Sequence, residues 1–87
     1  MSIIEKEGII MKAYVLINAR TGDVGAVVRQ IKRVSGVVDA NITFGPYDAV
    51  AVVEAENIIK VGNVIHDEIH PIPGVLDTLT CLAVDTE

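Results

Sequence analysis

Apolar side chains in the first half of the chain follow strand-like spacing, then helix-like spacing, then strand-like spacing again. Residues 14–19 are apolar and rich in residue types that favour strands, which predicts a buried β-strand. The next stripe is spaced by three and four residues and predicts an amphipathic helix: Val24, Val27, Val28, Ile31 and Val34. Ser35-Gly36 is expected to end this helix. Residues 37–44 alternate and predict a second strand, with one face made of Val38, Ala40, Ile42 and Phe44.

The second half of the chain repeats this order of elements in a modified form. Residues 48–55 are largely apolar on both faces and predict a third strand. Glu56-Asn57 is expected to cap a second helix that runs to about Ile69, because the two prolines within residues 70–74 break it. A last strand is predicted from Val75 to about Asp85, with one face made of Leu76, Thr78, Thr80, Leu82 and Val84.

A short internal repeat supports a fold built from two similar halves. Gly36-Val37-Val38-Asp39 recurs as Gly74-Val75-Leu76-Asp77, and Ile31 recurs as Ile69 at the same offset. We therefore predict an α+β, ferredoxin-like βαββαβ fold, in which a four-stranded antiparallel sheet carries two helices on one face. The domain is expected to occupy residues 12–87, after an N-terminal extension of residues 1–11.

The sheet face that the two helices leave uncovered is expected to be apolar as well. The chain has 87 residues, 51% of them apolar, and its mean hydropathy is +0.47. A domain of this size buries only about 60–65% of its unfolded surface. An antiparallel sheet with one solvated face normally alternates to polar residues there, and the first and third strands do not. We therefore predict an obligate homodimer that packs sheet to sheet.

Charge and cysteine content narrow the class of protein. The net charge is −5, and Lys and Arg are scattered apart from Arg29, Lys32 and Arg33, so we expect no direct contact with nucleic acid. No apolar run reaches the about 18–20 residues that span a bilayer, so we expect no membrane association. Charged residues near the N-terminus do not fit a signal peptide, and the chain has one cysteine. These features favour a cytoplasmic protein.

The sequence contains no convincing catalytic or metal-binding group. His66 and His70 are spaced to share one helix face, but Asp67 stands where a zinc-protease motif requires Glu, and we expect no metal site. Cys81 lies in an apolar strand and is expected to be an inert buried thiol. No glycine-rich phosphate loop is present, and we expect no cofactor. The protein is therefore not expected to be an enzyme.

The best candidate for a binding site is the turn between the second and third strands. Gly45, Tyr47 and Asp48 lie in that turn, and Thr78 and Thr80 share one face of the last strand. The five residues together could hold a zwitterion, with backbone amides and hydroxyls on its carboxylate and Asp48 on its ammonium. The simpler interpretation is an ordinary β-turn with a capping Asp, and two threonines that are common strand residues.

Two motifs in this order resemble a known family. Residues 45–50 (Gly-Pro-Tyr-Asp-Ala-Val) and 73–80 (Pro-Gly-Val-Leu-Asp-Thr-Leu-Thr) resemble the effector domain of the leucine-responsive/asparagine (Lrp/AsnC) transcription regulators, called RAM for regulation of amino-acid metabolism. The resemblance implies a ferredoxin-like fold, dimers that assemble into rings such as octamers, and amino acids bound where dimers meet. By position it implies one set of effector-site residues: Gly45, Tyr47, Asp48, Thr78 and Thr80. Cys81 departs from the aromatic residue that some relatives have there.

The resemblance does not extend to the front of the chain. Full-length members carry an N-terminal helix-turn-helix domain, and the ten residues before Met11 are too few for one. We therefore expect a stand-alone effector domain that senses a ligand as an oligomer or co-assembles with a full-length regulator. Three other interpretations stay open: a small ferredoxin-like enzyme, an ACT-like amino-acid sensor, and a purely structural interaction domain.

Overall fold

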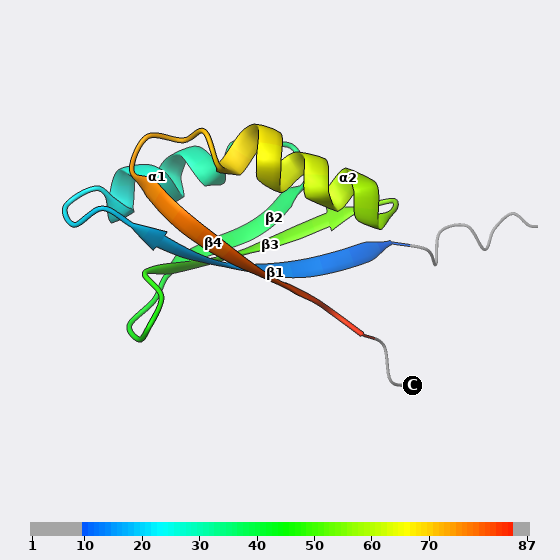
Figure 1. The fold of residues 1–87 in the computed structure, drawn as a ribbon, viewed down its shortest axis with the longest axis horizontal. Helices are drawn as coiled ribbons and strands as arrows, with labels where there is room; N and C mark the ends of the chain where they lie inside the picture. The colour runs from blue at the N-terminus through cyan, green and yellow to red at the C-terminus, as the bar shows by residue number, and fades with distance from the viewer. Residues whose placement is uncertain (1–9, 85–87) are drawn as a thin grey trace, which may run out of the picture.

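One antiparallel sheet, covered on a single face by helices, forms the body of the protein (Figure 1). The computed structural model describes residues 10–84. The elements in chain order are β1 (Met11–Ala19), α1 (Val24–Ile31), β2 (Val37–Ile42), β3 (Ala49–Ala55), α2 (Ile58–Asn63), η2 (Val64–Ile69) and β4 (Val75–Leu82). Segment η2 is a turn of π-helix that continues α2 directly. The predicted ferredoxin-like α+β fold is confirmed.

The sheet order is β2-β3-β1-β4, so β1 and β3 are central while β2 and β4 are edges. All three strand pairs are antiparallel. Val15 lies opposite Ala51 on one side and Thr80 on the other. Because paired residues in a ladder point to the same face, the side chains of Thr78, Thr80 and Leu82 are on the helix-covered side, with Ile17, Val15 and Ala13.

The core lies between the two central strands and the helices. Every second residue of β1 from Ala13 onward is buried beneath the helices. Three residues of α1 are buried on the side that packs on the sheet. The buried residues with no accessible surface are Ala13, Val15, Ile17, Val27, Ile31, Ala51, Val53 and Ile69. The predicted apolar stripe of the first helix is thus confirmed as far as Ile31, where the helix ends, and Val34 follows in a turn.

The internal repeat encodes the same local structure twice. Gly36 and Gly74 have φ values of 99° and 100°, which only glycine adopts without strain. Each is followed by an irregularity in the ladder, where Val38 or Leu76 is left without a partner in register. The prediction that Val38 shares one face of the strand with Ala40 is therefore wrong: the bulge turns Val38 to the other side, and it is 56% exposed.

Several predicted boundaries also need correction. Strand β1 begins at Met11, three residues before the predicted Tyr14, and β2 ends at Ile42 so that Phe44 is in a loop. Most of the predicted N-terminal extension, residues 1–9, lies outside the described residues, as does Asp85 at the predicted end of β4. The predicted cap of the second helix is confirmed, because Asn57 Oδ1 accepts a hydrogen bond from the Lys60 amide at 2.9 Å.

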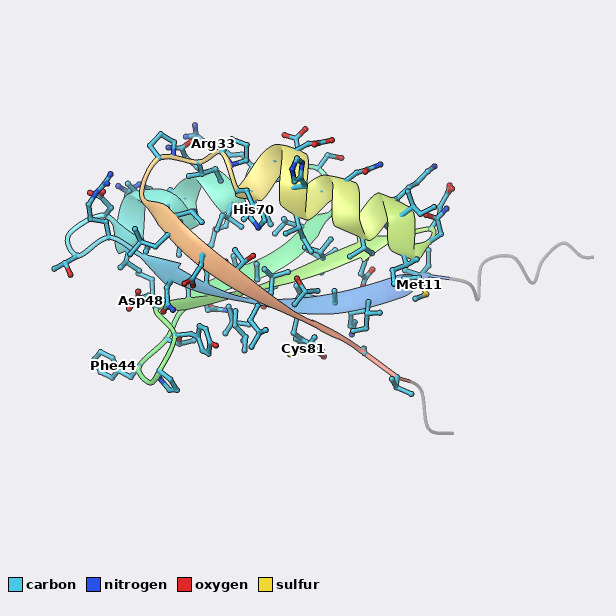
Figure 2. The ribbon with its side chains drawn as sticks, viewed as in Figure 1. Met11, Arg33, Phe44, Asp48, His70 and Cys81 are labelled. Carbon is cyan, nitrogen blue, oxygen red and sulfur yellow. The ribbon has the colours of Figure 1, made fainter. Side chains whose placement is uncertain are left out.

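The outer sheet face, opposite the helices, is apolar across the two central strands. We define it by six side chains that the ladder places on that side: Tyr14, Leu16, Val50, Val52, Leu79 and Cys81. Tyr14 and Leu79 remain 41% and 49% exposed. Figure 2 shows Cys81 on this side, and it is exposed rather than buried as predicted. Within residues 10–84, no helix is long and apolar enough to cross a membrane.

Replacing Gly74 should destabilise the fold strongly. A Cβ there would lie 3.0 Å from both Asp23 Cβ and Val27 Cγ2, in a backbone conformation that disfavours side chains. We expect Gly74→Ala to lower the free energy of unfolding by at least about 1–2 kcal/mol in urea titrations at fixed protein concentration. Gly62→Ala is the control, because a Cβ at this position meets no atom within 4 Å. Alanine favours a helix over glycine, so this variant should raise the free energy of unfolding by at most about 1 kcal/mol. Equal stabilities of the two variants would contradict this.

Candidate functional site

The loop between β2 and β3 is held at its base by the strand next to it. The Asp48 amide donates to the Ile17 carbonyl at 2.9 Å, and Asp48 Oδ2 accepts from the Ala19 amide at 2.8 Å. The Thr43 hydroxyl donates to the Tyr47 carbonyl at 2.9 Å. The Asp48 carboxylate therefore anchors the loop to β1, so part of its hydrogen-bonding capacity is already used within the chain.

The tip of this loop projects away from the body of the protein. Phe44 is fully exposed, and Figure 2 shows it on the side of the sheet opposite the helices. Gly45 has a φ of 147°, at the edge of the range that favours glycine, and Pro46 beside it is also exposed. A loop with these exposed residues offers a surface to another molecule and does not enclose a ligand by itself.

The two candidate threonines lie on the other side of β1, on the edge strand β4. Thr78 and Thr80 face the helices, and Thr78 Oγ1 is 2.8 Å from His70 Nε2. Figure 2 shows His70 between the helix and β4. This hydrogen bond ties the end of η2 to the edge of the sheet.

The structure thus divides the five predicted site residues into two groups. Gly45, Tyr47 and Asp48 belong to the β2–β3 loop, while Thr78 and Thr80 are on β4, with β1 between them. Two strand spacings of about 4.8 Å separate β3 from β4. The cavity that contains Thr80 contains none of the three loop residues. One chain alone therefore does not assemble the predicted zwitterion site.

A groove between the second helix and β4 is the feature that sequence reasoning missed. It has a volume of about 360 Å³. Its lining is mostly aliphatic, with polar groups from two histidines and one threonine: Ile58, Val61, Gly62, Ile65, His66, His70, Thr80 and Leu82. The spacing of the histidines was visible in the sequence, but which strand they face depends on the topology.

Segment η2 shapes one wall of this groove. The His70 amide donates to the Ile65 carbonyl at 2.9 Å, a bond to the fifth preceding residue that defines a π-helix. The rings of His66 and His70 approach edge to face, with centroids 6.0 Å apart. π-Helical turns are rare in proteins, and those that occur are frequently found at functional sites.

The histidine pair belongs to no cluster of three possible metal ligands in the described part of the chain. His66 Nδ1 is 2.9 Å from Asp67 Oδ1, and both side chains are exposed. Across residues 10–84, no three His, Cys, Asp or Glu side chains are close enough to hold a metal ion together.

Comparison with known proteins identifies the domain. Residues 12–87 match the family model described as the Lrp/AsnC ligand binding domain. The chain belongs to the Lrp/AsnC family. The resemblance that the two sequence motifs indicated is confirmed, and the family supports a regulatory effector-binding domain rather than an enzyme.

Individual relatives agree with this assignment. An uncharacterised HTH-type transcriptional regulator of Pyrococcus abyssi is 35% identical over 60 residues; the match covers 69% of this chain and 40% of that protein. The match therefore spans less than half of that regulator. The crystal structure of TTHA0845 from Thermus thermophilus superposes with a TM-score of 0.83 at 31% identity, covering 88% of this chain and 96% of that one.

A more distant structure shares the fold. The transcriptional regulator NMB0573 from Neisseria meningitidis, solved as a complex with L-Met, has a TM-score of 0.80 at 13% identity. The superposition covers 98% of this chain and 56% of that chain. At this identity the similarity shows the architecture alone, because one fold serves many functions.

Removing the Asp48 carboxylate should destabilise the domain. Asp48→Ala leaves the part-buried Ala19 amide without its acceptor, which should cost about 1–3 kcal/mol in chemical unfolding. Asp48→Asn keeps an acceptor oxygen and should lose less. Asp77→Ala is the control, because Asp77 makes an exposed bond to Asn18 and should change stability by at most about 0.5 kcal/mol. An Asp48→Ala variant as stable as the control would show that the carboxylate does not anchor the loop.

Proposed function

We propose that this domain is an amino-acid effector-binding and oligomerisation module of a cytoplasmic Lrp/AsnC-type regulatory system. The observation that carries the proposal is the combination of the family's ligand-binding domain with an apolar outer sheet face on the central strands. A monomeric protein rarely leaves a contiguous apolar surface of this kind in water, so a protein partner is expected there.

The partner that best fits the outer sheet face is a second copy of the chain. The face is smooth, formed by strands, and carries aliphatic side chains and one tyrosine at its centre: Tyr14, Leu16, Val50, Val52 and Leu79. Two such faces pack about 10 Å apart with interdigitating side chains. A two-fold axis makes the same patch serve both subunits, which is the commonest form of protein assembly. Further contacts between dimers would build the rings that the family suggests.

The amino-acid site is proposed where copies of the domain meet. The Neisseria regulator, which contains this architecture, was solved as a complex with L-Met, and this supports an amino acid as the ligand. In the present chain the exposed loop with Gly45, Tyr47 and Asp48 is separated from Thr78 and Thr80. The loop of one copy and the β4 threonines of another would bring together the two groups that one chain keeps apart.

One observation favours a second candidate function, a purely structural assembly domain that co-assembles with a full-length regulator. The Asp48 carboxylate is bonded to the Ala19 amide, and the Thr78 hydroxyl to His70. Two of the five candidate ligand-binding groups therefore already have partners within the chain. In a domain that serves only for assembly, these polar groups would be expected to have hydrogen-bond partners within the chain.

Placing a charge on the outer sheet face should break the dimer. Leu79→Arg introduces a guanidinium on β4 at a side chain that is 49% exposed in one chain, so the isolated subunit should still fold. We expect the mass measured by light scattering to fall at least twofold relative to the wild type. Ile59→Arg is the matched control, because Ile59 is 72% exposed on α2, away from that face. An unchanged mass for Leu79→Arg would exclude this face as the dimer interface.

Adding amino acids should reveal the effector. Each of the twenty amino acids is added to the wild-type protein, and the mass and the unfolding transition are measured. A site occupied at 100 times its dissociation constant should stabilise the protein by about 2.7 kcal/mol. Asp48→Asn and Thr78→Val should both weaken that response. A stable assembly that is indifferent to all twenty would favour the structural function instead.

A further inference from the structure

The groove between the second helix and β4 has the size and lining of a small-molecule site. Its volume of about 360 Å³ falls within the range of about 300–1,000 Å³ that ligand pockets occupy. Aliphatic side chains from both elements form most of the wall, with Ile58, Val61 and Ile65 on the helical side and Leu82 on β4. Such a wall favours an aliphatic chain that is removed from water.

A glycine keeps this groove open. Gly62 lines it within α2, and a Cβ built there would meet no atom within 4 Å. Glycine is unfavourable in a helix by about 1 kcal/mol relative to alanine, and no positive φ requires it at this position. Helix stability therefore does not explain why residue 62 is a glycine. The space that a missing side chain leaves in the groove does explain it.

The polar groups of the groove are all able to donate hydrogen bonds. They are the imidazoles of His66 and His70 and the hydroxyl of Thr80. The hydrogen bond to Thr78 Oγ1 holds the His70 ring in place, and a hydroxyl that donates to Nε2 leaves the ring proton on Nδ1. The contact of His66 runs the other way: Nδ1 donates to Asp67 Oδ1 at 2.9 Å, so Nε2 of the neutral ring is an acceptor. No acidic side chain is among the lining residues.

We infer that this groove binds a small monocarboxylic acid with an aliphatic chain, and that it does so without recognising an ammonium group. The aliphatic chain of the ligand occupies the space beside Gly62, and its carboxylate accepts hydrogen bonds from the Thr80 hydroxyl and from His70 Nδ1. This site shares Thr80 with the amino-acid site of the proposed function, but its other lining residues differ and it does not depend on a second copy of the chain. Its ligand class includes branched-chain 2-oxo acids and short fatty acids.

The acidic groups around the groove explain why the ligand should lack an ammonium group. Asp77 lines the neighbouring cavity with His70 and Thr78, on the far side of their hydrogen bond, and its carboxylate accepts from Asn18 Nδ2 at 3.1 Å. Asp48 is bound to the Ala19 amide. The Asp67 carboxylate beside the groove is bonded to His66 Nδ1. An ammonium group in the groove would therefore find no anionic partner among the lining residues, which is unfavourable.

A matched set of acids tests the inference by methyl NMR of the full-length protein. The probes are 4-methylpentanoate, its 2-oxo derivative and leucine, which share one side chain and differ at the carbon next to the carboxylate. We expect the first two to shift the methyl signals of Ile58, Ile65 and Leu82, and leucine to bind at least tenfold more weakly. Equal or tighter binding of leucine in the groove would overturn the ligand class.

Filling the groove tests its location. Gly62→Met places a flexible side chain in the open space and should weaken binding of 4-methylpentanoate at least tenfold, while Asn63→Met, on the next residue and outside the lining, should leave it unchanged. Thr80→Val removes the hydroxyl at nearly constant shape and should weaken binding about tenfold, which corresponds to one hydrogen bond to a charged group. Unaltered binding to Gly62→Met would show that the acid binds elsewhere.

Two further outcomes separate this inference from the proposed function. No binding of either acid at tens of millimolar would overturn the inference; if Gly62→Met also lowered the assembly mass, the groove would be a contact between copies. The response of the wild type to amino acids and the mass of Leu79→Arg test the proposed function alone. Either hypothesis can therefore fail while the other stands.

Discussion

The central strands β1 and β3 carry apolar side chains on both faces, but the fold provides helices for only one of them. Ile17 and Val53 are fully buried against α1 and the second helix, whereas Leu16 and Val52 point the other way. A shift of strand register by one residue would not remove the apolar outer face, because it would only exchange the apolar side chains of the two faces. The proposed dimer would cover that face, and association would then be part of folding.

The same sheet order determines where ligands can bind. Strand β1 lies between the β2–β3 loop and the β4 threonines, so the two groups do not face a common space. The loop bonds to β1 and does not enclose a cavity. A site that uses both groups needs another copy of the domain. The groove beside α2 needs none, because one helix and one edge strand of the same chain form it. The two proposed sites therefore differ in whether they depend on assembly.

The sequence was sufficient for the order of elements, the fold and the family, because each rests on local spacing or on a motif. It failed where the backbone departs from regular spacing. The bulge after Gly36 reverses the orientation of Val38, and alternation alone cannot show an extra residue. The π-helical turn at Val64–Ile69 has no signature in apolar spacing. Which strand faces His70 depends on long-range pairing, so the groove was not predictable from its residues.

The π-helical turn is one of these irregular segments, and it positions a histidine that lines the groove. Its hydrogen bond from His70 to Ile65 spans one residue more than an α-helical bond would, and it lies directly before the residues that lead into β4. His70 at this point bonds to Thr78, so the helix end and the edge strand are joined through a polar contact rather than by apolar packing. His70 is exposed and borders both cavities, whereas Thr78 is half-buried and borders only the cavity that Asp77 lines. A contact of this kind contributes little to global stability, but it fixes the orientation of the imidazole, which is what a binding groove requires and a structural core does not.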